Sequence, residues 1–395
     1  DTIFVSKSSE MKCYNFYSTK FFLCFCFLFF NCNSKEDKYK EISYLREIYA
    51  QQDASKWPAP FIDSLVDKNT FQDIGILPKV KFPEDNPYSK EKKALGKALF
   101  FDARLSKTGQ IACSSCHNPE LAWTDNITRS FGHNRQVNNR NSMTIKNVAF
   151  AHTLFWDGRA NSLEEQASMP ISDPLEMNTE KNIAVANINK VKGYKPLFKK
   201  AFGDETVSLD RILKAIATYE RTIISRGSKF DRFIKGKKNA FTDQEVLGLH
   251  LFRTKARCIN CHNTPYFSDN QFHNDGQTLF GTKFEDFGKY YKTQNPDDLG
   301  KFKTPTLREV GKSGPWMHHG HFPSILDVVE FYNLGNPSPI QKKYLGIGRD
   351  SLIPNTSPLL KRLNLTRLEM DAVIAFLETL STRTQRVNLK IIPKY

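Results

Sequence analysis

The chain has 395 residues, of which 39% are hydrophobic, and it carries a formal net charge of +15 at pH 7. This hydrophobic content is enough to build the cores of two ordinary domains, and it excludes an intrinsically disordered protein. The basic residues are scattered, with no arginine-rich helix and no aromatic RNA-reading signature. The charge therefore indicates a solvated basic surface and not a nucleic-acid-binding protein.

The first 32 residues have the pattern of a secretory leader. Lysines come first, and the apolar run Phe21–Phe30 that follows is too short to span a bilayer as a mature helix. Cys32 precedes the polar stretch "NSKEDKYKE", as at a bacterial lipoprotein processing site, although "FFN" stands where small residues are usual. We predict export to the periplasm, with a lipid anchor at Cys32 as an open alternative, and an N-terminal extension over residues 33–84.

The next feature is an internal repeat. The segment "EKKALGKALFF" precedes "CSSCH" at Cys113–His117, and the similar "DQEVLGLHLFR" precedes "CINCH" at Cys258–His262. Four residues after the first motif recur 162 positions later: Thr144, Val148, Gly158 and Ser162 correspond to Thr306, Val310, Gly320 and Ser324. Repetition at this period indicates two related units in tandem.

Helix signals dominate both units. Leu209, Ile212, Ile216 and their neighbours in "SLDRILKAIATYERTII" follow helical periodicity. Capping-box spacings at Thr242 and Thr366, each followed three residues later by glutamate, predict two further helix starts. The rest is rich in loops.

We therefore predict a mainly α protein with two tandem domains and long loops. The N-terminal domain covers residues 85–235, and the C-terminal domain covers residues 236–395. In each, short helices surround a large bound group, because the loops alone would bury little.

The two CxxCH motifs are compatible with three chemistries. A zinc site needs four ligands close together, whereas these motifs lie 145 residues apart and each has its own histidine. A redox dithiol would not need the histidine. Covalent haem c needs all three residues, since the thiols form thioethers and the adjacent imidazole ligates the iron. We predict two haem c groups, attached at Cys113, Cys116, Cys258 and Cys261, with His117 and His262 as proximal ligands. The two tandem domains are therefore predicted to be cytochrome c-like haem domains.

The residue on the other side of each iron decides the function, because an iron with an open or releasable position can react with a small molecule. In "GPWMHHGHF" Met317 is the candidate for the second haem, with His318, His319 and His321 as alternatives. The repeat places Phe155 at the equivalent position of the first unit, and phenylalanine cannot ligate iron. The first haem is therefore open or ligated by His133 or His152.

The ordered motifs "CSSCH", "RNSMT", "FWDGRANSLEEQ", "PLEM", "CINCH", "KTPTLREV" and "WMHHG" resemble the bacterial dihaem cytochrome c peroxidase family, which includes the MauG-type enzymes. The resemblance covers about residues 85–380. It implies a low-potential peroxidatic first haem and a high-potential second haem. It also implies that the second haem accepts electrons from a small cytochrome c or cupredoxin, and that the protein forms a homodimer.

The resemblance assigns roles to individual residues. The family's releasable distal histidine falls on His133, its pocket glutamine and glutamate fall on Gln166 and Glu176, and its inter-haem tryptophan falls on Trp156. The resemblance implies that the first haem reduces hydrogen peroxide, a reaction that requires a proton to move from one peroxide oxygen to the other. A carboxylate in a partly dry pocket, such as Glu176, suits that transfer, and Gln166 can hydrogen-bond the peroxide without taking charge.

The resemblance also implies a calcium ion between the domains. Its ligands would be Asn141 and main-chain carbonyls near Thr304 and Thr306. Met143 stands where the family usually has proline, which is a departure in this loop.

Two other functions stay open. One is oxidation of a protein side chain, as in the MauG branch, which has tyrosine where Met317 stands here. The other is a non-enzymatic electron carrier in which both irons keep two protein ligands.

Overall fold

The computed structural model describes residues 35–335, 352–384, 386–388 and 392–394, so the predicted leader with Cys32 lies outside the described residues. The protein is mainly helical, as predicted, and its one sheet in the described ranges is a two-stranded antiparallel pair. The helices are α1 Lys35–Tyr49, α2 Lys90–Phe100, α3 Cys113–Cys116, α4 Leu163–Ser172, α5 Lys181–Asn189, α6 Lys195–Phe202, α7 Leu209–Glu220, α8 Lys229–Ile234, α9 Asp243–Arg253, α10 Tyr290–Thr293, α11 Ile325–Leu334 and α12 Arg367–Glu378; the strands are β1 Phe272–His273 and β2 Phe302–Lys303.

The predicted helix starts at Thr242 and Thr366 are confirmed. Each side chain accepts a hydrogen bond from the main-chain N–H three residues later, at Glu245 and Glu369, and both glutamates complete a capping box. The predicted helix after Ser208 is also present as α7, with Ser208 as its N-cap. No helix of the described ranges is both long and apolar enough to cross a membrane.

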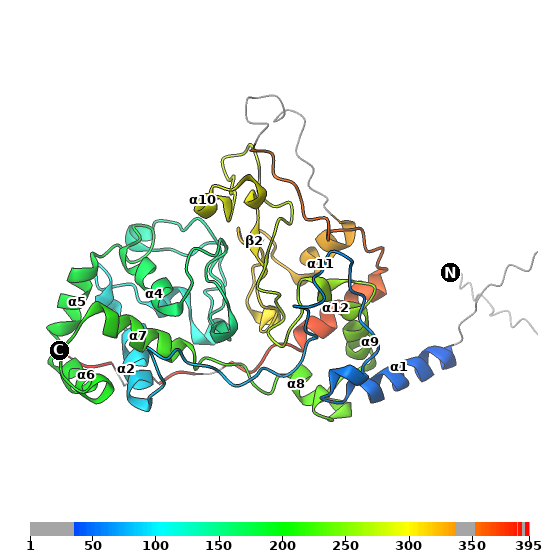
Figure 1. Cartoon of the computed structure of the whole chain (residues 1–395), viewed down its shortest axis with the longest axis horizontal. Coiled ribbons are helices and arrows are strands. Elements are labelled where there is room, and N and C mark those ends of the chain that lie inside the picture. The colour runs from blue at the N-terminus through cyan, green and yellow to red at the C-terminus, as the bar shows by residue number, and fades with distance from the viewer. Residues whose placement is uncertain (1–34, 336–351, 385, 389–391, 395) are drawn as a thin grey trace, which may run out of the picture.

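The helices form two lobes (Figure 1), each with its own hydrophobic core. Helices α2, α4, α5, α6 and α7 surround one core, and α8, α9, α11 and α12 surround the other. Strands β1 and β2 and helix α10 lie toward the middle of the molecule (Figure 1). The largest helix contacts are α2 with α7 in the first lobe and α9 with α12 in the second.

These two helix pairs cross in the same way. A Cβ atom at Gly96 of α2 would collide with the main chain of α7 at Ala215, and one at Gly248 of α9 would collide with α12 at Ala372. Both glycines come from the matching stretches "ALGKALF" and "VLGLHLF". The repeat in the sequence is therefore a repeat of helix packing, and any larger residue at either glycine would push the helices apart.

The contact between the lobes also follows the repeat. The N–H of Asn141 donates to the carbonyl oxygen of His318 at 2.7 Å, and the N–H of Lys303 donates to that of Trp156 at 2.8 Å. Asn141 and Lys303 are 162 positions apart, as are Trp156 and His318. The same backbone N–H of each unit thus donates to the equivalent carbonyl of the other unit.

The N-terminal extension packs on the second lobe. Leu45, Tyr49, Trp57 and Ile74 belong to the core that also contains α9 and α12. The chain then crosses to the first lobe to begin α2 (Figure 1). At the other end, Val387 packs against the first core, and the guanidinium of Arg104 donates to the carbonyl of Pro393 at 2.9 Å. Both chain ends therefore tie the two lobes together.

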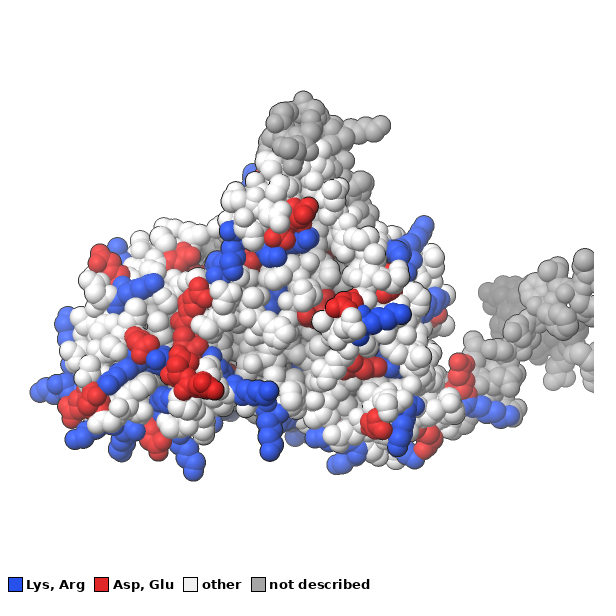
Figure 2. Space-filling model, in the orientation of Figure 1, with Lys and Arg blue, Asp and Glu red and all other residues white. Residues whose placement is uncertain are grey.

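Basic and acidic side chains are interspersed over both lobes on the face shown in Figure 2. Several form exposed ion pairs, such as Arg211 with Asp204 at 2.6 Å. The high net charge is thus distributed over this face and not gathered into one patch.

Candidate active site

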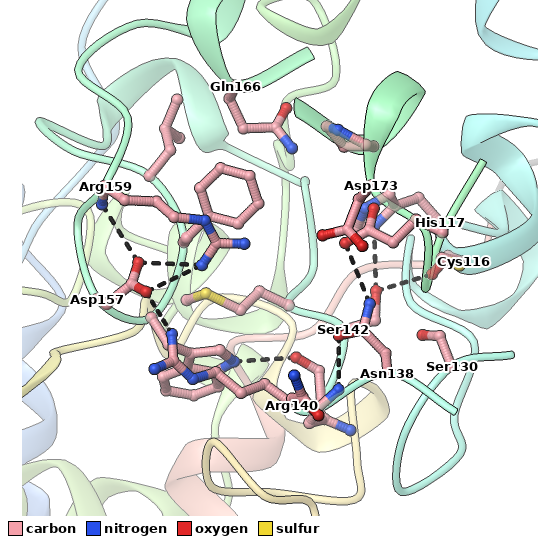
Figure 3. Close-up of a pocket in the computed structure, with 18 of the residues that line it drawn as sticks. Cys116, His117, Ser130, Asn138, Arg140, Ser142, Asp157, Arg159, Gln166 and Asp173 are labelled. Atoms are coloured by element: carbon pink, nitrogen blue, oxygen red, sulfur yellow. Dashed lines mark hydrogen bonds and ion pairs between the residues drawn. The ribbon is translucent and has the colours of Figure 1, made fainter. Parts of the chain in front are cut away.

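A cavity of about 690 Å³ lies against the first CxxCH motif (Figure 3). Cys113, Cys116 and His117 form one side of its lining, from α3 and the residue after it. The other walls come from α4 and its C-terminal turn, from the loop 138–159, and from the second half of the chain at Tyr266, Lys283–Asp286, Tyr291 and Lys303.

His117 is held in an orientation that suits a metal ligand. Its Nδ1 lies 3.2 Å from the carbonyl oxygen of Trp123 and 3.4 Å from Oγ of Ser142, so Nε2 is the nitrogen that remains for the iron. Burial lowers the pKa of His117, and the imidazole is therefore neutral at pH 7, as ligation requires.

The cavity fits a covalently attached haem. Its volume falls within the range of cofactor pockets, its lining is mixed polar and apolar, and both thiols of the motif reach it beside the histidine. Burial raises the pKa values of Cys113 and Cys116, so both are neutral thiols in this structure.

The second motif repeats the same design. Nδ1 of His262 lies 3.0 Å from the carbonyl oxygen of Phe267, which corresponds to Trp123 in the first unit. Trp123 and Phe267 both have positive φ, 65° and 58°, so the same turn presents both carbonyls. Burial lowers the pKa of His262 as well.

Cys261, Asp269 and His273 form a group that could hold a metal ion by distance alone, because their ligand atoms lie within 4.8 Å of one another. His273 Nε2 is 2.7 Å from the Asp269 carboxylate. Cys261 is the second cysteine of "CINCH", however, and a thioether to haem would occupy its sulfur. This group therefore belongs to the second haem site.

Glu176 and Gln166 both line the first cavity, Gln166 from α4 and Glu176 from the turn that follows it. Oε1 of Glu176 accepts a hydrogen bond from Nδ2 of Asn138 at 3.1 Å. Burial raises the pKa of Glu176, and the negative charge of Asp173 acts in the same direction while the Asn138 hydrogen bond opposes it. A carboxyl with a raised pKa in a cavity is suited to proton transfer.

His133 is buried, with 7% of its surface exposed, but its side chain is not part of the cavity lining. Its N–H donates to the carbonyl of Glu176 at 2.7 Å, while its Nδ1 has no partner among the described residues. The main chain at His133 is therefore bonded to the main chain at Glu176, a residue that lines the cavity, and the imidazole of His133 has one nitrogen without a hydrogen-bond partner among the described residues. His152 is exposed on the surface and does not line the cavity.

Trp156 connects the first cavity to the loop of Met317. Its indole N–H donates to the carbonyl of Asn141 at 2.9 Å, and its ring lies edge-on to His318 at 6.3 Å between centroids. Met317 and Phe155 occupy equivalent turns, with φ of 67° and 65°. The structure thus gives Phe155 the backbone position that Met317 has in the second unit.

The three histidines after Met317 have structural partners. His318 stacks on Phe302 at 3.6 Å between ring centroids, and His319 Nε2 lies 3.1 Å from Gln277 Oε1. The exposed His321 donates its N–H to Nδ1 of His319 at 3.0 Å. Burial lowers the pKa of His318 and His319.

A charged network closes the side of the cavity away from Cys116 and His117 (Figure 3). Arg140 donates to Asp157 at 2.6 Å and to both oxygens of Asp286 at 2.7 and 2.8 Å. Arg159 donates to both oxygens of Asp157 at 3.1 and 3.0 Å. Arg140 therefore links the first unit to residues of the second at the cavity wall.

Sequence reasoning missed several charged residues of this cavity, and two of them, Glu220 and Lys303, are buried. Glu220 ends α7, is 4% exposed, and has one oxygen without a partner among the described residues. Burial raises its pKa to about 8. Lys303 reaches the cavity from β2. The helical pattern places Glu220 beside Tyr219 on the buried face of α7, but nothing in the sequence shows that a cavity opens there.

The predicted calcium residues lie at the contact between the lobes. Asn141 donates through Nδ2 to the carbonyls of Ile127 and Thr128 at 2.9 and 3.2 Å, so its Oδ1 is the atom that would meet a cation. The carbonyl of Thr304 accepts a hydrogen bond from Oγ of Ser268 at 2.7 Å. These neutral oxygens are of the kind that Ca²⁺ prefers.

The proteins that this chain resembles include di-haem peroxidases, in agreement with a haem site beside the first CxxCH motif. Residues 90–239 match the family model described as "Di-haem cytochrome c peroxidase". The chain is 37% identical over 350 residues to cytochrome-c peroxidase IdrP1 of Pseudomonas sp. (strain SCT), covering 81% of this chain and 89% of the relative. It is 34% identical to methylamine utilization protein MauG of Methylophilus methylotrophus, covering 84% of this chain and 97% of that protein.

Among solved structures, it is similar to a MauG-like protein associated with microbial copper homeostasis. The TM-score is 0.69 and the identity is 31%, over 81% of this chain and 96% of that structure. The chain therefore belongs to the di-haem cytochrome c peroxidase family, whose relatives here are oxidoreductases of the peroxidase and MauG type.

Proposed function

We propose that the protein reduces hydrogen peroxide to two molecules of water, with two electrons supplied by a small cytochrome c or cupredoxin and two protons from solvent. The observation that carries this proposal is a cavity beside the first CxxCH motif that holds a neutral, oriented His117 together with Glu176 and Gln166. Haem iron bound there would supply the site of peroxide binding and of electron delivery.

The chain's own residues supply the proton chemistry. The carboxylate of Glu176 would take the proton from one peroxide oxygen and return it to the other, which then leaves as water. The hydrogen bond from Asn138 would fix the orientation of the Glu176 carboxylate in the cavity. Burial raises the pKa of Glu176, which favours a group that both accepts and releases the proton. Gln166 would hold the peroxide through its amide without changing charge.

Electrons would enter through the second unit, where Cys258, Cys261 and His262 would hold a haem and Met317 would be its other ligand. The contact of His318 with Trp156 supports a route toward the first cavity. In this proposal residues 85–235 and 236–395 form the two haem domains. Asn141, with the carbonyls near Thr304 and Thr306, would bind calcium at their contact.

The proposal also includes export by the leader, with a lipid anchor at Cys32, and a homodimer. His133 would act as the releasable ligand of the first haem. Its unpartnered Nδ1 and the short bond from its N–H to Glu176 support a position close to the cavity.

Peroxide turnover by the purified, calcium-loaded holoprotein tests this function. After one-electron reduction, the first haem is expected to become high-spin and to bind cyanide, and added peroxide is expected to oxidise the reduced donor. A holoprotein in which both haems stay six-coordinate and no peroxide is consumed would contradict the proposal and favour an electron carrier.

Oxidation of a protein side chain is the second candidate function, because the MauG relative is matched over 97% of its length. Met317 distinguishes the two candidate functions, because the MauG branch has tyrosine at this position. If peroxide produces a long-lived oxidised state of the holoprotein that the small donor does not quench, this second function is favoured.

A further inference from the structure

Lys303 is a buried cation without a partner. It is 3% exposed, and among the described residues its Nζ has no ion pair and no hydrogen-bond acceptor. Its Nζ lies over the ring of Tyr266, 5.8 Å from the ring centroid. Asp269 is the negative charge that acts on it, but that carboxylate is already hydrogen-bonded to His273 at 2.7 Å.

An ammonium group in this position costs free energy unless an anion neutralises it. Lys303 lines the first cavity, although it belongs to the second unit. The structure therefore presents one positive charge to the cavity that the protein's described residues do not compensate. A negatively charged group on the molecule that fills the cavity would neutralise this charge.

The position of Lys303 within the cavity shows which part of a haem would meet it. Cys113 and Cys116 fix the thioether edge of the ring, and the two carboxylates of a haem lie at the opposite edge. The N–H of Lys303 donates to the carbonyl of Trp156 at 2.8 Å, which places its backbone beside the Trp156–Asp157 turn. Figure 3 shows Asp157 on the side of the cavity away from Cys116.

Lys283 also lines the cavity but is exposed, and the two arginines on that side already have carboxylate partners within the described residues. Arg159 is bonded to Asp157, and Arg140 is shared between Asp157 and Asp286. Lys303 differs from them because it has none. At the position that corresponds to Lys303 in the repeat, the first unit has the neutral Asn141, so the two units are also asymmetric in charge here.

We propose that Lys303 of the second unit binds a carboxylate of the haem held in the first cavity. The proposal rests on haem occupancy of that cavity and goes beyond the peroxidase function, because it makes the first haem's reduction potential depend on a residue of the other unit. Lys303 acts here as a positioning and electrostatic residue and takes no part in the proton transfer.

The test is a redox titration of the holoprotein, followed by the absorption of each haem, for Lys303→Gln and Lys303→Arg. A nearby cation disfavours the oxidised haem, which carries one more positive charge than the reduced haem, so loss of the Lys303 cation stabilises the oxidised form. We therefore expect Lys303→Gln to lower the ratio of reduced to oxidised first haem about tenfold at a fixed potential, which corresponds to about 59 mV for one electron. Lys303→Arg should stay close to the wild type.

The second haem of the same molecule is the internal reference, and its potential should move much less. Lys301→Gln is the matched control, since Lys301 lies two residues away, is partly exposed and lies outside the cavity lining, with its Nζ 3.6 Å from the buried carboxylate of Asp298. An unchanged first haem in Lys303→Gln, or an equal shift in Lys301→Gln, would overturn the proposal.

A crystal structure of the wild-type holoprotein gives an answer that does not depend on any variant folding. Nζ of Lys303 is expected within hydrogen-bond distance of a haem carboxylate oxygen, and a different partner would overturn the proposal. Neither measurement uses peroxide, so a protein that fails to turn over peroxide can still show the Lys303 contact, and the two proposals can fail separately.

Discussion

Replacing Glu176 by glutamine is expected to lower kcat/KM for hydrogen peroxide by about 10²–10⁴-fold, the contribution of a well-placed proton-transfer group. Glutamine has the same size and keeps an oxygen that can accept the hydrogen bond from Asn138, so the cavity should keep its shape. It cannot take a proton from peroxide. Steady-state peroxide consumption with a reduced donor measures the loss.

Glu180→Gln is the matched control for this variant. Glu180 lies four residues further along and is exposed, and it makes no side-chain cap to α5. Its activity should equal that of the wild type. If Glu176→Gln retains activity within about threefold while both haems remain attached, the proton acceptor lies elsewhere, and Glu220 becomes the next carboxyl of the cavity to replace.

The pH profile provides a second readout of Glu176. The carboxylate form is the one that can accept the peroxide proton, so activity should fall as the pH drops through the pKa of Glu176. Burial and the charge of Asp173 raise this pKa above its usual value of about 4.5. The activity should therefore begin to fall at a higher pH than it would with a solvent-exposed glutamate. Glu176→Gln should lose this limb, and a limb unchanged in the variant would assign it to another group.

The sequence predicts the haem attachment and the repeat because both depend on local spacing. A CxxCH motif places two thiols and an imidazole within one turn, whatever surrounds it. The glycine in "ALGKALF" and "VLGLHLF" signals the helix crossing, since only a residue without Cβ lets α2 and α9 approach their partner helices at Gly96 and Gly248. Capping boxes are equally local, which is why the starts of α9 and α12 are correct.

The cavity wall could not be predicted in the same way, because it is assembled across the repeat. Lys303 and Asp286 belong to the second unit but line the first cavity, and no spacing in the sequence indicates that contact. The position of His133 could not be predicted from the sequence either. Its sequence offers an imidazole, but only the fold shows that the imidazole is buried beside Glu176 and outside the cavity lining.

The N-terminal extension had no functional explanation from its sequence, and the structure supplies one. The N–H of Asp63 donates to Oδ1 of Asn260 at 2.8 Å, and Asn260 stands between the two cysteines of the second motif. The carboxylate of Asp63 pairs with Arg257, next to Cys258, and with Lys361 at 3.1 Å. The extension therefore braces the segment that would carry the second haem.

Arg253 on α9 joins the extension to the second lobe. Arg253→Met is expected to destabilise this lobe by about 3 kcal/mol, because it removes a buried guanidinium and leaves the half-buried carboxylate of Asp73 without its ion-pair partner. The guanidinium is fully buried and pairs with Asp73. It also donates to the hydroxyl of Tyr49 at 3.0 Å and to the carbonyl of Pro58 at 2.7 Å. Guanidinium titration of the holoprotein, followed by circular dichroism and by the absorption of the second haem, measures the change.

Arg367→Ala is the control, because Arg367 on α12 makes only an exposed pair with Asp371 at 3.0 Å and a longer one with Glu330, and such pairs contribute about 0–1 kcal/mol. Adding Asp73→Asn to Arg253→Met should recover part of the lost stability, since the double variant no longer has an unpaired charge at this half-buried position. If Arg253→Met were as stable as the control, the extension would not be held through this residue. A loss of stability with no recovery in the double variant would instead assign the effect to the contacts with Tyr49 and Pro58.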